Sequence, residues 1–587
     1  LDCLFYPEIA RNYPCFLVNT GEAVAALGVP THDKKRDRYA YSELQPGRAH
    51  MLELARHYES IEARNRSSVE QQILDLAHNV FRFEELIQFL DFARARFTAA
   101  EGSALAAAIT DPQGAVTSEL VALLDRVSDE VLAQGDTMGA EQVERERQVM
   151  SEVYFQQLMP VMTCAQAIAC IPSPDRDERQ WYSPGELPHL ALDQGQPRPE
   201  LLGLLGHFEK MAANREARLA AGDDAEANAA LDAAFVEELR GFRGAVIPEA
   251  EARGEYDRVP LEVFFYRAKF VFYSQWLYVL SFVLVAISWL LPRRRIVDWA
   301  VSLSVWAPTL LLVAGITLRC IIRNRPPVTT LYETILFVTA VAVTVAMCIE
   351  WINRRRIAVA VASFLGMLGM FLAYRYEIKE GVDTMPSLIA VLDTNFWLAT
   401  HVTTVTMGYS AGLLAGAIAH LYIFCRLFGI RRDDIDFNRG LTRMVYGVLC
   451  FGILFATVGT VLGGIWANDS WGRFWGWDPK ENGALLIVLW GLIILHARLG
   501  RYIRDLGIHM SAVAMGMVVA FSWWGVNLLG VGLHSYGFTS GIGLILKIFW
   551  IAESVVLLVG GFVWLLEHSG SRAALATLDP EDDARTA

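Results

Sequence analysis

Residues 466–496 read WANDSWGRFWGWDPKENGALLIVLWGLIILH. Five of the sixteen tryptophans in the 587-residue chain lie in the first 25 of these residues. Aromatic belts place tryptophans at membrane interfaces, but they do not gather several of them in one short segment. The clustering therefore favours a surface that binds a flat hydrophobic ligand.

The tryptophan segment lies among long apolar runs. Runs of about 20 apolar residues, enough to span a bilayer, are absent before about residue 268 and follow closely after it. The sequence predicts an all-α, polytopic membrane protein with a mostly helical N-terminal domain. We expect nine spans, at about residues 270–291, 297–322, 331–352, 357–374, 397–425, 444–465, 483–499, 509–529 and 543–565.

Positive charge in the short loops predicts the orientation, because lysine and arginine are retained on the cytoplasmic side. The loops after the first, third, fifth and seventh predicted spans carry Arg293–Arg295, Arg354–Arg356, Arg431, Arg432, Arg439, Arg501 and Arg504. The N-terminal domain, the tryptophan segment and the loop around His534 are then extracytoplasmic, and the C-terminal tail is cytoplasmic.

Three domains are expected: an extracytoplasmic helical domain over residues 1–265, a membrane domain over 266–567 and an acidic tail over 568–587. In the first domain, apolar residues recur at helical spacing at Ile73, Leu76, Val80, Phe83 and Ile87. The net charge is −13, and the absence of a basic patch excludes a nucleic-acid partner.

None of the eight cysteines has the C-x-x-C spacing of a redox or haem-attachment motif, so the chain is not itself a c-type cytochrome. Cys164 and Cys170 are either a disulfide or two free thiols. No signal peptide precedes the first domain and residue 1 is leucine, so we expect further chain upstream.

The residues after the tryptophans have the form of a helix start. Asp478 is a candidate N-cap, Pro479 the first helical residue and Glu481 the partner in a capping box. The helix would direct its positive dipole end at the tryptophans and favour an anion there. Arg473 and Lys480 would reinforce this preference, unless they are interfacial cations that snorkel.

Histidine inside a membrane is costly and indicates function. His401 is predicted near the outer end of the fifth span, and His534 in the last outer loop. Two neutral imidazoles beside a flat aromatic surface are what six-coordinate haem iron requires. His496, near the inner end of the seventh span, is either functional or a core histidine bonded to a neighbouring helix, and His420 is interpreted as structural.

The segment WGRFWGWDPKENGALLIVLWGLIILH resembles the WWD signature of haem-handling membrane proteins, with the motif at residues 466–490. Its WDPKE core is closest to the CcsA (ResC) type of system II cytochrome c synthetase. The resemblance covers roughly residues 265–567 and includes RPPVTTLYET, THVTTVTMGYS around His401 and GVGLHSYGF around His534. Asn482 and Gly483 depart from it, because the family often has aromatic residues there.

The resemblance implies that haem b is the bound substrate and that His401 and His534 are its axial ligands. It assigns haem contacts to Trp466, Trp471, Trp475, Trp477 and Asp478, and a role in haem transit to His496. Haem would be received from the cytoplasmic side and attached by thioether bonds to the C-x-x-C-H motif of an apocytochrome c.

The resemblance also implies partners and a location, the bacterial inner membrane. A CcsB/ResB-like protein, separate or fused upstream, and a thiol-reducing thioredoxin-like protein would act with the chain. The leading hypothesis is a haem lyase. The alternatives are a haem transporter or chaperone that serves a separate lyase, and an unrelated polytopic transporter.

Overall fold

The computed structural model describes residues 2–19, 21–33, 37–61, 66–134, 138–173, 180–193, 199–292, 294–380, 385, 396–529 and 542–578. The chain forms two compact units, Leu1–Asp257 and Arg258–Ala587. We call them unit 1 and unit 2.

Unit 1 is helical apart from two short antiparallel strand pairs, β1 with β2 and β3 with β4. Its first half contains α1 (Asp2–Phe5), α2 (Pro7–Asn12), β1 (Phe16–Val18), α3 (Gly21–Ala26), β2 (Asp37–Tyr39), α4 (Tyr41–Leu44), η1 (Gln45–Gly47), α5 (Arg48–Glu59) and α6 (Ser68–Gln88). Its second half contains α7 (Asp91–Arg94), α8 (Ala104–Ala108), α9 (Thr117–Ala133), α10 (Ala140–Glu152), η3 (Val153–Leu158), α11 (Met159–Cys164), β3 (Ile171–Pro172), β4 (Trp181–Tyr182), η4 (Pro184–Glu186), α12 (Leu187–Asp193), α13 (Pro199–Ala220) and α14 (Ala225–Ala252).

The amphipathic helix predicted in unit 1 is confirmed as α6. The side chains predicted on its apolar face, from Ile73 to Ile87, are all buried. Ser67 and Glu70 form a capping box at its start. In the second half of the unit, Cys164 and Cys170 are free thiols, the second of the two predicted alternatives. Burial raises the pKa of the Cys170 thiol to about 11, so it is a weak nucleophile at neutral pH.

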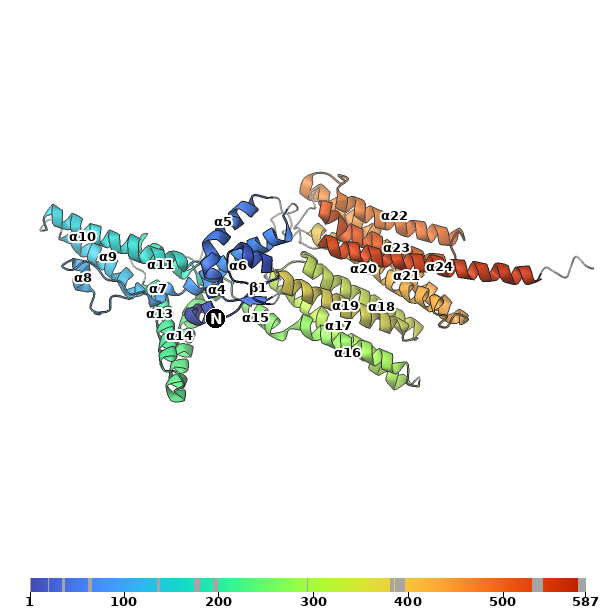
Figure 1. Ribbon diagram of the computed structural model, residues 1–587, viewed down its shortest axis with the longest axis horizontal. Helices are drawn as coiled ribbons and strands as arrows, with labels where there is room; N and C mark the ends of the chain where they lie inside the picture. The colour runs from blue at the N-terminus through green and yellow to red at the C-terminus, as the bar shows by residue number, and fades with distance from the viewer. Residues whose placement is uncertain are drawn as a thin grey trace, which may run out of the picture. The chain divides into compact units, whose positions relative to one another are not determined.

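In the described part of unit 2, nine helical segments are long and apolar enough to cross a membrane, which confirms the predicted fold class. In Figure 1 the long helices of this unit run side by side. They are α15 (Val259–Ala268) with α16 (Phe270–Ser288), α17 (Arg295–Arg323), α18 (Leu331–Asn353), α19 (Ile357–Glu380), α20 (Phe396–Leu427), α21 (Ile435–Trp471), α22 (Pro479–Leu499), α23 (Asp505–Trp523) and α24 (Ile542–Leu578).

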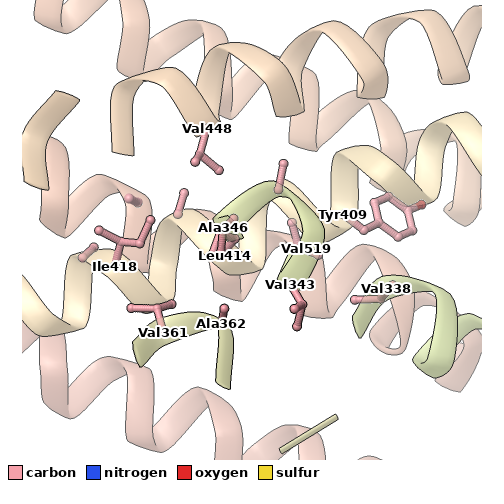
Figure 2. Close-up of a cluster of buried hydrophobic side chains, with 14 of the residues drawn as sticks. Val338, Val343, Ala346, Val361, Ala362, Tyr409, Leu414, Ile418, Val448 and Val519 are labelled. Carbon is pink, nitrogen blue, oxygen red and sulfur yellow. The ribbon is translucent and has the colours of Figure 1, made fainter. Parts of the chain in front are cut away.

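Helix α20 lies at the centre of unit 2 and packs against α18, α21, α23 and α24. Figure 2 shows Leu414 and Ile418 of this helix among buried apolar side chains that include Val343 of α18 and Val519 of α23. Small residues let its neighbours approach closely, as at Gly408, where an added Cβ would lie 2.9 Å from Ala456 of α21. The helix that carries His401 is thus a fixed element of the core.

Helix α21 is longer than its predicted span, which ended at residue 465. The apolar run ends there, but the helix continues for six residues to Trp471. Gly472, with φ 71°, adopts the left-handed conformation that terminates the helix. Hydropathy detects the end of an apolar run, whereas the helix end is set by this glycine.

Candidate haem site at one end of the helix bundle

His401 projects from α20 toward α21. Its Nδ1 lies 2.7 Å from the carbonyl oxygen of Gly459. Because a carbonyl can only accept, Nδ1 carries the hydrogen and the lone pair of the neutral ring is on Nε2. Histidines that bind metals commonly donate their second ring N–H to a backbone carbonyl in this way, which fixes the tautomer and the ring orientation. This hydrogen bond fixes the orientation of the His401 ring and puts the lone pair of the neutral ring on Nε2.

Two glycines one turn apart on α21 allow α20 to approach closely, and one of them makes room for this imidazole. A Cβ at Gly463 would lie 2.5 Å from Cε1 of His401, closer than real Cβ contacts allow. A Cβ at Gly459 would lie 2.5 Å from the backbone nitrogen of Val405 on α20. Neither glycine was among the predicted functional residues, although glycines spaced by four residues in a membrane helix are a known signal of close packing.

The last two turns of α21 place two tryptophans beside His401. The rings of His401 and Trp466 are nearly parallel, 10° apart, with centroids separated by 6.2 Å. Trp466 is 1% exposed, and Trp471 meets it edge to face at 4.7 Å. Both tryptophans thus belong to a helix rather than to a loop.

Two further tryptophans of the segment occupy the turn between α21 and α22. Trp475 and Trp477 are perpendicular, with centroids 6.1 Å apart. Trp477 has φ 57° and its side chain is 71% exposed. A bulky residue rarely adopts this left-handed conformation, and such backbone strain is concentrated at functional sites.

Hydrogen bonds from the first turn of α22 hold this strained turn. The Glu481 carboxylate accepts from the N–H groups of Gly476 at 2.8 Å and Asp478 at 3.1 Å. The Asn482 amide donates to the carbonyl of Trp477 at 3.0 Å. Asn482, the departure from the family pattern, thereby contributes to the backbone conformation that exposes the Trp477 ring.

The capping interpretation of Asp478 is confirmed. Its buried carboxylate accepts from the backbone N–H of Lys480 at 3.0 Å, and Glu481 completes the capping box. The N-terminus of α22, with its partial positive charge, is next to the tryptophan turn.

The two cations beside the cap have different roles. The Lys480 ammonium donates to the carbonyls of Trp523 at 2.7 Å and Ser522 at 3.4 Å, so it caps the C-terminus of α23. Arg473 is exposed, and an added Cβ at Gly476 would lie 2.3 Å from its Cζ. Within the described part of the chain, Arg473 forms no ion pair.

His496 is not part of this group of residues. It lies 18 positions after Asp478, a separation of about 27 Å along an α-helix. Its Nδ1 is 2.8 Å from the carbonyl of Leu492 in the same helix, and the side chain is exposed. The alternative of a core histidine bonded to a neighbouring helix is therefore wrong. His534 lies outside the described residues.

Comparison with known proteins assigns the family. Residues 328–534 match the family described as "Cytochrome C assembly protein", a range that includes His401, the tryptophan segment, His496 and His534. The cytochrome c biogenesis protein CcsA of Synechococcus sp. (strain CC9902) is 30% identical over 265 residues, which cover 40% of this chain and 86% of the relative.

Two further relatives have the same description. CcsA of Prochlorococcus marinus (strain NATL1A) is 30% identical over 300 residues, covering 44% of this chain and 94% of the relative. CcsA of Chlamydomonas reinhardtii is 31% identical over 240 residues, covering 39% of this chain and 66% of the relative. With this similarity and nine apolar helices, the chain is a multi-pass membrane protein that belongs to the CcsA-type cytochrome c biogenesis proteins.

Proposed function

We propose that the chain binds haem b beside the tryptophan turn and promotes its covalent attachment to apocytochrome c. The observation that supports the proposal is the hydrogen bond from Nδ1 of His401 to Gly459, because it selects the tautomer whose lone pair is on Nε2, the atom proposed to bind iron. His534 is the proposed second axial ligand.

The surroundings of His401 suit a flat, partly charged ligand. The buried Trp466 packs beside the imidazole and Trp471 packs on Trp466, while the exposed ring of Trp477 offers an apolar contact surface. Arg473 and the N-terminus of α22 supply positive charge for the carboxylates of the haem propionates. Asp478 acts through the helix cap, so its proposed contribution is to position the turn.

The proposed thioether formation needs no nucleophile from this chain. Each cysteine of the C-x-x-C-H motif adds its sulfur to one vinyl carbon and its hydrogen to the other, so one C=C bond becomes a thioether without net oxidation. The contribution of the chain is to hold the vinyl groups in reach of the thiols, and to tune the iron through its axial ligands.

The site is proposed to face the extracytoplasmic side of a bacterial inner membrane. The arginines at 294, 295, 354–356, 431, 432, 501 and 504 follow alternate predicted spans. The positive-inside rule would put these loops on the cytoplasmic side, and the tryptophan turn on the other side. Unit 1 is then extracytoplasmic. A CcsB/ResB-like protein and a thioredoxin-like protein that keeps the cysteines reduced are the proposed partners.

A second candidate function is haem transport or delivery to a separate lyase. The exposed imidazole of His496 near the other end of α22 favours it, because this histidine would meet haem at the cytoplasmic side. Its Nδ1 donates to Leu492, so its Nε2 also carries the lone pair.

Purification from a haem-replete host tests haem binding. We expect a visible spectrum of bis-histidine iron that is lost in His401→Ala, and a colourless wild-type protein would contradict both functions. Co-expression with a C-x-x-C-H apocytochrome and the CcsB/ResB-like protein, in a host without its own maturation system, separates lyase from carrier. Haem that stays on the cytochrome after denaturation indicates the lyase, and bound haem without covalent product indicates the carrier.

A further inference from the structure

An ionisable pair joins α20 and α24 inside their membrane-spanning segments. Nε2 of His420 lies 3.3 Å from Oε2 of Glu553. Glu553 is 8% exposed, and an ionised carboxylate at this depth is expensive unless it is neutralised. The sequence predicts a structural role for His420 and gives no indication of a role for Glu553.

The hydrogen bond of His420 to Gly416 determines which ring nitrogen faces Glu553 with a lone pair when the ring is neutral. Nδ1 lies 2.7 Å from the carbonyl oxygen of Gly416, so Nδ1 carries a hydrogen. A neutral ring would then direct the Nε2 lone pair at a carboxylate oxygen, and the two would repel. Oε2 of Glu553 has no hydrogen-bond partner among the described residues that would offset this repulsion. One additional proton, on either group, turns the repulsion into attraction.

We propose that His420 and Glu553 together form an intramembrane site that binds one proton, and that this proton fastens α24 to α20. Helix α24 depends on its few contacts with other helices, because only 22% of its most apolar stretch is buried. This is the smallest share among the nine described spans. A proton lost from the pair weakens the packing of α24.

The charged groups nearby do not replace this proton. Arg426 of α20 and Glu567 of α24 form a separate ion pair, whose arginine stays charged at all relevant pH values. His509 of α23, a helix that packs against both α20 and α24, instead stacks on Tyr422 and contacts Thr442. No other ion pair among the described residues includes His420 or Glu553.

The pair also connects the segments that carry the two proposed iron ligands. Helix α20 carries His401, and α24 begins at Ile542, soon after His534 in the chain. This connection rests on the proposed function: when the pair loses its proton, haem retention is expected to fall.

The test measures the melting temperature of the full-length, haem-free protein in detergent as a function of pH. In the wild type we expect the melting temperature to fall by about 2–4 °C as the pH rises and the pair loses its proton. Glu553→Gln and His420→Gln should each abolish this fall. Glu567→Gln is the matched control. It breaks the ion pair with Arg426, which joins the same two helices but is not proposed to gain or lose a proton. It should lower the melting temperature equally at every pH.

An unchanged pH profile in Glu553→Gln would overturn the proposal, as would loss of the pH-dependent fall in Glu567→Gln. If the glutamine variants do not fold, ¹⁵N NMR of histidine-labelled wild-type protein decides, with His420→Asn used to assign the signal. If the spectrum shows that Nε2 alone of the His420 ring carries a proton, the proposal that the pair binds an additional proton is wrong. Because these measurements need no haem, a colourless protein would refute the proposed function and leave this test intact.

Discussion

The imidazole of His401 and the indole of Trp466 lie in nearly parallel planes, with ring centroids 6.2 Å apart. One residue comes from α20 and the other from the end of α21, so this relationship depends on how closely the two helices approach. Glycines 459 and 463 permit that approach.

Gly463→Ala should displace the His401 ring, because the new Cβ would lie 2.5 Å from Cε1. We expect a several-fold loss of bound haem and a shifted spectrum of the remainder, measured by visible spectroscopy per mole of protein. Gly447→Ala in the same helix is the control, since an added Cβ there meets nothing within 4 Å. Its haem content should equal the wild type, with stability raised by about 0.5–1 kcal/mol. Equal haem content in both variants would contradict the packing argument.

Trp477→Gly should separate stability from ligand binding. Glycine adopts φ 57° without steric cost, so the variant should be as stable as the wild type or more stable by about 1 kcal/mol. It should nevertheless retain less haem, because the exposed indole is lost. Denaturant unfolding and haem content are the two measurements, and a destabilised variant that keeps its haem would refute the assignment.

Arg473→Gln and Lys480→Met distinguish the two cations beside the cap. Lys480→Met removes the donor from the Trp523 and Ser522 carbonyls and should destabilise the protein by about 1–3 kcal/mol. Arg473→Gln should leave stability within about 0.5 kcal/mol and weaken haem binding. Thermal unfolding and haem titration measure the two effects, and the reverse pattern would show that Lys480 faces the ligand.

Unit 1 should lose stability as the pH rises above about 6.5, the ordinary pKa of histidine. Hydrogen bonds from His32 to Glu43 at 3.0 Å and Asp37 at 3.1 Å raise the pKa of this histidine above its ordinary value of 6.5. The protonated ring stabilises the folded state fully below about pH 6.5, and this contribution is lost as the pH passes the raised pKa. The protection of β2 backbone amides from hydrogen exchange, measured across this pH range, should decrease as this contribution is lost. His32→Gln should remove the dependence, and a variant with the wild-type profile would contradict this origin.

Local sequence signals were sufficient for much of the fold. Each span needs only an apolar run of the right length, and the α22 start needs only Asp478, Pro479 and Glu481 at their spacing. The α6 face likewise follows from helical periodicity between Ile73 and Ile87. These features depend on residues within one helix.

The site depended on contacts that local signals do not encode. The acceptor for His401 is a backbone carbonyl 58 residues away, and any residue type offers a carbonyl. The role of Lys480 depends on where α23 ends, and the left-handed Trp477 has no sequence signature of its own. The His420–Glu553 pair joins residues from two helices whose adjacency hydropathy does not predict.

The junction between α22 and α23 also limits how the site can open. Lys480 binds the Trp523 carbonyl, and the Ser522 hydroxyl donates to the Gly483 carbonyl at 2.7 Å, with Gly483 packed directly against Ser522. The start of α22, which follows the tryptophan turn, and the end of α23, which precedes the segment with His534, are therefore held rigidly together. A disulfide that cross-links α22 to α23 at this junction should therefore leave haem retention unchanged, because it restrains two helices that are already packed and hydrogen-bonded together.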